Sequence, residues 1–238
     1  SCVDAANGNT LWRNDSFKGV PRFFTAMSPI VVDDLAVLHL DGPSSGSVVA
    51  FELGKGTIRW RWDGDGPAYA SPVLANVEGT RQLVMLTDKN LIGLDVRNGQ
   101  VLWKVEFTPS GMNYNAATPI VDGVIVYFAG AGRGSRAVRI EKSGDAFSVK
   151  ELWTNPDVAP QFNSPVLVDG KLFGLSQRGN LYCLDAATGK TLWMDETRHS
   201  GFGAILGSPR AILAMTERSG LIAFAPKGDG FQSLATYQ

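Results

Sequence analysis

Residues 183–193 of the chain read CLDAATGKTLW, and this stretch carries the motif that decides the fold. Its core is an acidic residue, Asp185, then Gly189 four positions later and Trp193 four positions after that. The same spacing occurs at Asp4–Gly8–Trp12, Glu52–Gly56–Trp60 and Asp95–Gly99–Trp103, and a looser copy is Glu141–Gly144–Trp153. The copies recur about every 45 residues, which indicates a repeat architecture.

A second marker, a hydroxyl residue followed by proline, recurs in phase with the first. It occurs at Ser28–Pro29, Ser71–Pro72, Thr118–Pro119, Ser164–Pro165 and Ser208–Pro209, in steps of 43, 47, 46 and 44 residues. Two markers in phase along the whole chain favour one continuous array. We therefore expect a single domain over residues 1–238.

Each repeat reads as four short strands. In residues 164–194, apolar runs at 164–168, 171–175, 181–185 and 190–194 are separated by turn residues, and Asp169–Gly170 is a preferred two-residue hairpin turn. No helical periodicity is present. Four antiparallel strands per repeat of this length are typical of a β-propeller blade.

We therefore predict an all-β propeller with five full blades and one half blade. The expected blades span 1–15 (partial), 25–63, 69–107, 116–155, 162–196 and 205–238. In the fourth of these the two outer strands are expected near 137–141 and 149–153. In the last, Ser208–Pro209 opens the first strand, and the strands fall near 208–210, 211–215, 221–225 and 231–235.

The motif residues have architectural interpretations. A Trp on the outer strand can stack onto the neighbouring blade and bury apolar area. The Gly allows a positive φ in the turn before that strand, and the acid can accept hydrogen bonds from turn amides. The residues assigned to blade docking are Trp12, Trp60, Trp103, Trp153, Trp193, Gly8, Gly56, Gly99 and Gly189.

Composition restricts the function classes. The chain has 238 residues, is 44% hydrophobic and carries a net charge of −1, so no overall field favours nucleic acid or an anionic membrane. No apolar run reaches the ~18 residues of a membrane-spanning helix. Cys2 and Cys183 occupy equivalent positions in different repeats, so we expect no disulfide between them.

No convincing catalytic or metal-binding set is visible. Asp63-Gly64-Asp65-Gly66 begins like a calcium loop, but position twelve is Leu74 instead of the bidentate Glu, so a tight inter-blade turn is the better interpretation. His39 and His199 lie in different repeats without a second ligand at metal spacing. The glycine-rich residues 129–134 join two strands and open no helix, so we expect a hairpin tip rather than a phosphate loop.

One pattern suggests a binding surface. In a four-stranded blade the second hairpin and the link to the next blade emerge on the same face. The hairpins carry one basic residue in each of four blades, and the links carry aromatic and amide residues, a combination typical of interface hot spots. The candidate face comprises Lys89, Arg133, Arg178, Arg218, Tyr69, Tyr114, Asn115, Gln161, Phe162 and Asn163, with Phe23, Phe24, Asn113 and Phe202 nearby. The alternative is that the tips are merely polar and the aromatic residues lie under the loops.

These motifs resemble the quinoprotein-type propeller repeat, named for pyrroloquinoline-quinone enzymes. Its pattern is A-x-D-x-x-T-G-x-x-x-W, with S-P-V-V opening the blade, and residues 183–193 match it best. Three copies replace Thr188 by Asn7, Lys55 or Asn98, and the last copy, near Gly228, lacks both acid and Trp. The resemblance covers essentially the whole chain and implies a ring of seven or eight blades, of which this chain is a segment.

The resemblance implies two functional branches. One comprises quinone- and calcium-dependent alcohol or sugar dehydrogenases, which use adjacent cysteines, a calcium site and a catalytic Asp. The other comprises non-enzymatic extracytoplasmic propellers, such as the lipoprotein subunit of the outer-membrane β-barrel assembly machinery. This chain has no adjacent cysteine pair.

We therefore favour a non-enzymatic periplasmic or otherwise extracytoplasmic scaffold that binds a protein or polymeric ligand, with no cofactor and no nucleic acid. The alternatives are a fragment of a dehydrogenase that uses pyrroloquinoline quinone and calcium, and a structural propeller module of a larger surface protein. The localisation follows from the resemblance alone.

Overall fold

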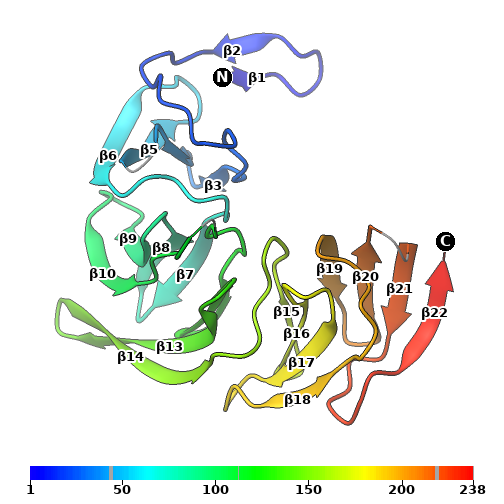
Figure 1. Cartoon of the computed structure of the whole chain (residues 1–238). Coiled ribbons are helices and arrows are strands. Elements are labelled where there is room, and N and C mark those ends of the chain that lie inside the picture. The colour runs from blue at the N-terminus through cyan, green and yellow to red at the C-terminus, as the bar shows by residue number, and fades with distance from the viewer. Residues whose placement is uncertain (43–44, 112, 218–219, 238) are drawn as a thin grey trace.

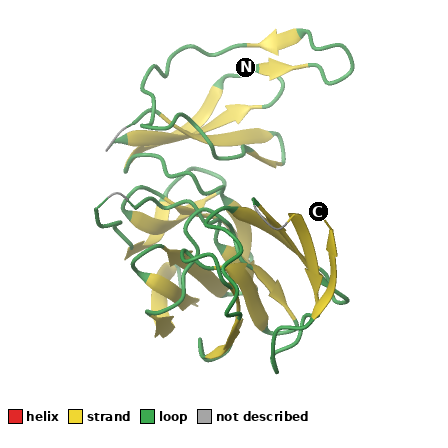
Figure 2. Ribbon diagram, turned by 45° about the vertical axis from the view of Figure 1, so that its right-hand side comes forward, coloured by secondary structure: helices red, strands yellow, loops and turns green. Residues whose placement is uncertain are grey.

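The computed structural model describes residues 1–42, 45–111, 113–217 and 220–237, and these form small sheets arranged along an open arc (Figure 1). The arc begins with a two-stranded sheet, β1 (Cys2–Val3) and β2 (Thr10–Trp12). Strands and loops make up all of the described chain (Figure 2), so no described segment is a helix that could cross a membrane.

Five four-stranded antiparallel blades follow. Blade 1 contains β3 (Ile30–Val32), β4 (Leu35–Leu40), β5 (Gly46–Glu52) and β6 (Ile58–Gly64). Blade 2 contains β7 (Val73–Val77), β8 (Thr80–Leu86), β9 (Asn90–Asp95) and β10 (Val101–Glu106). Blade 3 contains β11 (Ile120–Asp122), β12 (Ile125–Gly130), β13 (Gly134–Ser143) and β14 (Ala146–Asn155). Blade 4 contains β15 (Val166–Val168), β16 (Lys171–Leu175), β17 (Leu181–Asp185) and β18 (Thr191–Met194). Blade 5 contains β19 (Gly203–Gly207), β20 (Ile212–Thr216), β21 (Gly220–Phe224) and β22 (Ser233–Tyr237).

The predicted all-β propeller is therefore confirmed. Within each blade the strands pair in chain order, so every connection is an antiparallel hairpin. The apolar core lies in the seams between blades. The cluster between blades 1 and 2, for example, joins Val37 and Val48 of blade 1 to Leu83 and Ile92 of blade 2. Because each sheet packs on both faces, its inner strands read as continuous apolar runs.

The tryptophans lie at these seams. The Trp60 indole N–H donates to Val96 O at 2.8 Å in blade 2, and its ring covers Gly99 so closely that a Cβ there would overlap it. The pattern recurs at Trp12 with Gly56 and at Trp153 with Gly189. In each case the indole binds the carbonyl three residues before the glycine.

The second marker also forms a chain of contacts between blades. The Ser28 amide donates to Ser71 Oγ at 3.0 Å, the Ser71 amide to Thr118 Oγ1 at 3.1 Å, and the Thr118 amide to Ser164 Oγ at 2.9 Å. These hydroxyls therefore connect the first residues of blades 1, 2, 3 and 4 in series.

Two strand expectations were wrong. Ser208–Pro209 does not open blade 5, because β19 already ends at Gly207 and Ser208 forms the following turn, accepting the Ala211 amide on Oγ. In blade 3 the outer strands are twice the expected length, ten residues each, because the insertion in the looser motif extends the hairpin instead of forming a loop.

Candidate binding face

The second hairpins and the inter-blade links lie together and are joined by backbone hydrogen bonds. The Phe107 amide donates to Lys89 O at 2.8 Å, the Gln177 amide to Ala159 O at 2.8 Å, and the Tyr69 amide to Asn115 O at 2.9 Å. Hairpins and links therefore build one face of the arc.

Two asparagines of the candidate face are buried anchors of the links. Asn115 Nδ2 donates to Thr87 O at 2.8 Å and to Phe107 O at 3.1 Å. Asn163 Nδ2 donates to Leu175 O at 2.7 Å. Both side chains satisfy backbone carbonyls and are not available at the surface.

Arg133 is also turned inward. Its guanidinium lies 4.0 Å from the Phe107 ring centroid and donates to Phe107 O at 2.6 Å and Asn115 Oδ1 at 2.7 Å. Burial, with a smaller contribution from nearby Arg136, lowers the pKa of Arg133 to about 10. Arg133 therefore holds the link of Asn115 in place.

The other basic positions differ. Lys89 and Arg178 are exposed, whereas Arg218 lies outside the described residues. Gln161 is half-buried.

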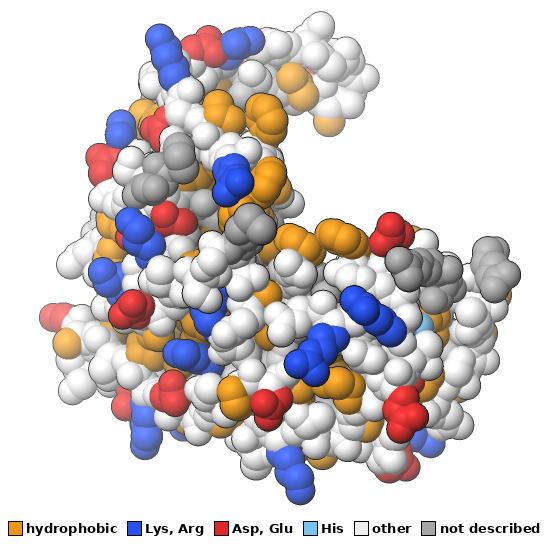
Figure 3. All heavy atoms as spheres, in the orientation of Figure 1, with side chains coloured by type: hydrophobic (Ala, Val, Ile, Leu, Met, Phe, Trp, Pro, Cys, Tyr) orange, Lys and Arg blue, Asp and Glu red, His pale blue; other side chains and the backbone are white. Residues whose placement is uncertain are grey.

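The aromatic side chains of the links form two clusters. Phe23, Tyr69 and Tyr114, from three successive links, have ring centroids 5.3–6.1 Å apart. Phe162 and Phe202, from the next two links, stack at 5.1 Å with planes 7° apart. Phe23 is 57% exposed, Phe162 41% and Phe202 56%. Figure 3 shows hydrophobic side chains along the concave edge of the arc. Each inter-blade link therefore presents an aromatic ring on this face.

Two concavities adjoin the Tyr69–Tyr114 pair. One, of about 430 Å³, is lined by Phe23, Ala26, Tyr69, Tyr114, Ala116 and Phe162. The other, of about 290 Å³, shares the two tyrosines with the first and includes Asp88. Asp88 was not among the predicted residues, because only the basic residue of each second hairpin, here Lys89, was assigned to the candidate face.

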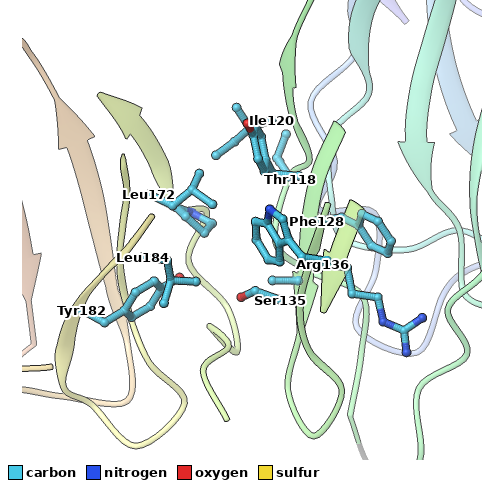
Figure 4. A pocket seen from close by; sticks show the side chains of 12 residues that line it. Thr118, Ile120, Phe128, Ser135, Arg136, Leu172, Tyr182 and Leu184 are labelled. Carbon is cyan, nitrogen blue, oxygen red and sulfur yellow. The ribbon is translucent and has the colours of Figure 1, made fainter. Parts of the chain in front are cut away.

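A third gap lies in the seam between blades 3 and 4 (Figure 4), where Leu172, Tyr182 and Leu184 face Ile120 and Ser135. Its volume is about 10 Å³, the space of a single water molecule. Burial raises the pKa of the Tyr182 phenol. This gap belongs to blade packing and is too small for a ligand.

The residues that suggested calcium do not fit a calcium site. Asp65 Oδ2 accepts from Thr87 Oγ1 at 2.8 Å and Asn90 Nδ2 at 2.6 Å, and Asp63 Oδ1 accepts from Ser47 Oγ at 2.6 Å. Their oxygens thus serve hydrogen-bond donors of two blades. No group of three His, Cys, Asp or Glu side chains suited to a metal occurs among the described residues.

The histidines have local roles. His39 Nε2 lies 2.9 Å from Asp65 O, and burial lowers the pKa of His39 to about 4. His199 Nε2 lies 2.5 Å from Asp195 Oδ2. Both cysteines are unpaired, and burial raises the pKa of the Cys183 thiol to about 12.

A family model described as outer membrane protein assembly factor BamB matches residues 1–195 and 145–230. The chain belongs to this BamB family. The resemblance to the quinoprotein-type repeat is thereby confirmed. BamB of Shewanella oneidensis is 20% identical over 228 residues, which cover 91% of this chain and 56% of that protein. The chain thus spans little more than half the length of this relative.

Solved structures share the fold. BamB from Moraxella catarrhalis superposes with a TM-score of 0.66 at 19% identity, covering 86% of this chain and 61% of that one. The β-propeller domain of Cps50 (Swd1) from Myceliophteria thermophila gives a TM-score of 0.55 at 13% identity, covering 86% and 68%. At these identities the likeness establishes the propeller architecture.

Proposed function

We propose that this chain is part of a non-enzymatic propeller that binds a protein partner during outer-membrane protein assembly, on the periplasmic side of that membrane. The observation that carries the proposal is the aromatic ring presented by every inter-blade link, together with exposed Arg178 on the second hairpin of blade 4. Exposed aromatic side chains with arginine are the residues that dominate protein interfaces. Membership of the BamB family supports the cellular setting.

The partner-binding face consists of Tyr69, Tyr114, Phe162, Phe202 and Arg178. The anchors Asn115, Asn163 and Arg133 support this face from beneath, because their side chains donate to backbone carbonyls of the neighbouring strands, hairpins and links. Because a rigid scaffold lowers the entropy cost of ordering an interface, such anchoring favours binding.

Site-specific photo-crosslinking in cells tests the proposal. A photoreactive phenylalanine replaces Phe162 or Phe202 in the full-length parent protein, and Leu192, exposed on β18, serves as the control position. We expect Phe162 and Phe202 to yield crosslinks to proteins of outer-membrane assembly and Leu192 to yield none. Equal crosslinking from all three positions would contradict the assignment of the face.

We also propose that further blades of the parent protein complete the ring beyond this segment. The outer face of blade 5 exposes Leu206 and Met215 at 68% and 61%. At the other end, a concavity of about 240 Å³ between the β1–β2 sheet and blade 1 is lined by Trp12, Phe17 and Phe51, among others. Exposed apolar surface of this kind is typical of an interface.

A further inference from the structure

The Asp88 pocket is the 290 Å³ concavity between the links of the first three blades. Its lining includes Pro21, Arg22, Pro67, Tyr69, Asp88 and Tyr114. This volume lies at the low end for small-molecule sites. It suits one large side chain of a partner better than a cofactor.

The pocket walls are mostly apolar. Pro21, Pro67 and Pro109 contribute rings, and Tyr69 and Tyr114 stand edge to face with centroids 5.7 Å apart. Such walls fit an aliphatic stem and offer aromatic faces to a cation.

Three charged side chains line the pocket, and their circumstances differ. The Arg22 guanidinium lies 5.6 Å from the centroid of the Phe23 ring, and Lys89 has an interaction of its own. By contrast, Asp88 Oδ1 is buried and has no hydrogen-bond partner among the described residues. A buried carboxylate oxygen without a hydrogen-bond donor lowers the stability of the fold. A ligand that donates a hydrogen bond to this oxygen would therefore be stabilised in the pocket.

The surroundings of Asp88 agree with this deficit. Burial raises the pKa of its carboxyl and Asp65 adds to that rise, whereas Lys89 and the backbone amides of Gly66 and Asp88 itself oppose it. A cationic donor that entered the pocket would offset the desolvation of the carboxylate and form a charge-assisted hydrogen bond.

We propose that the Asp88 pocket receives a lysine or arginine side chain of the partner protein, its stem lying against Tyr69 and Tyr114 and its cationic head pairing with Asp88. This inference rests on the proposed function, because it names the chemistry of the partner at one point of the same face. Among large side chains, a basic one supplies the N–H donor that Asp88 Oδ1 lacks, which an aliphatic or acidic one does not.

Binding of small probes to the chain of residues 1–238 tests the inference directly. N-acetyl-arginine amide is titrated while NMR signals of Tyr69 and Tyr114 are followed. N-acetyl-citrulline amide, which has nearly the same shape without the charge, serves as the matched probe, and N-acetyl-glutamate amide carries the opposite charge. We expect saturable shifts with the arginine probe and about tenfold weaker binding of the citrulline probe, the factor expected for a hydrogen bond to a charged group.

The variant D88N should weaken binding of the arginine probe by about tenfold. D157N, which makes the same charge change at an exposed position of the fourth link, should leave it unchanged. Equal binding of the arginine and citrulline probes, or tighter binding of the glutamate probe, would overturn the inference. Because the comparison of probes uses the unmodified chain, it decides the matter even if D88N fails to fold.

The two proposals fail in different ways. If crosslinks form from Phe162 but the arginine probe does not bind, the face is retained and the Asp88 pocket is wrong. If the probe binds but no crosslinks form, the pocket recognises a basic group and the partner-binding face is wrong.

Discussion

The glycine of the repeated motif has two roles: its backbone adopts a positive φ, and its lack of a side chain leaves room for a tryptophan ring. At Gly99 φ is +72°, its amide donates to Asp95 O at 2.8 Å, and the Trp60 ring covers the position where a Cβ would stand. Only glycine meets both conditions without strain. The motif therefore encodes the seam between blades as well as the turn within one.

Gly99→Ala should lower the free energy of unfolding by about 2–4 kcal/mol, because overpacking adds to the backbone strain. Gly123→Ala is the matched control: its φ is +59°, but a Cβ there meets open space. We expect that control to cost about 1 kcal/mol, from the backbone alone. Urea unfolding of both variants measures the difference, and equal losses would mean that the ring does not press on the glycine.

His39 should make stability depend on pH. Its folded-state pKa of about 4 lies below its ordinary value of 6.5, so the unfolded chain binds the extra proton as pH falls through this range. The contribution is fully present above about pH 6.5 and is lost as pH falls to about 4, with a total of about 3 kcal/mol.

His39→Gln keeps a donor for Asp65 O and removes the titration. We expect the free energy of unfolding, followed by urea titration between pH 4 and 7, to lose about 1.4 kcal/mol less per pH unit in the variant than in the parent. Identical slopes in the two proteins would show that His39 is not held neutral by burial.

At the level of elements, the sequence predicted most of the fold because the determinants are local. Turn residues such as Asp169–Gly170, and the apolar runs between such turns, can be recognised in the sequence without knowing which blades pack together. The errors arose where two signals competed. Ser208–Pro209 has the spacing of the repeat, but strand β19 consists of the residues that precede Ser208. These residues form the strand because Ile205 is buried in the seam with blade 4.

The seam between blades 2 and 3 departs from the repeat for a related reason. Trp103 has no motif glycine opposite it, and its indole donates instead to Gln82 Oε1 at 2.6 Å in its own blade. The long β13–β14 hairpin replaces the missing contact. Phe147 packs against the apolar cluster that blades 2 and 3 share, and Lys142 Nζ donates to Thr80 Oγ1 of blade 2 at 3.2 Å. The inserted residues thus form a clasp over blade 2.

Phe147→Ala should loosen that clasp. Because the ring is only partly buried, we expect a loss of about 1–2 kcal/mol in the stability of the hairpin. Hydrogen exchange of the amides of β13 and β14 should accelerate accordingly, while that of blades 4 and 5 stays unchanged. Lys150→Ala, an exposed change on the same strand, is the control. Uniform acceleration along the whole chain would contradict a local clasp.

The whole molecule adds what no single repeat contains. The hairpins and links lie together, but the burial of their side chains could not be read from the sequence, because Asn115 and Arg133 look as polar as exposed residues do. The Asp88 pocket was equally hidden, since three links that are far apart in the sequence build it. Local patterns specify blades, whereas a site at the mouth of the arc depends on how the blades are placed side by side.

The exposed face of blade 5 offers a test of the complete ring. Leu206 lies on β19 and Met215 on β20, and the register, which pairs Leu206 with Leu213, puts both on one side of the sheet. In the chain of residues 1–238, L206K together with M215K should change the free energy of unfolding by less than about 0.5 kcal/mol and reduce self-association, since both residues are exposed.

In the full-length parent the same pair should cost several kcal/mol, because a packed neighbouring blade would bury two unpaired charges. Urea unfolding measures the loss of stability, and sedimentation velocity measures self-association, in the chain of residues 1–238 and in the full-length parent. L192K, at an exposed position of β18, should change the free energy of unfolding by the same small amount in both proteins. If L206K with M215K were equally harmless in the longer protein, no blade would cover this face there, and the arc would remain open beyond blade 5.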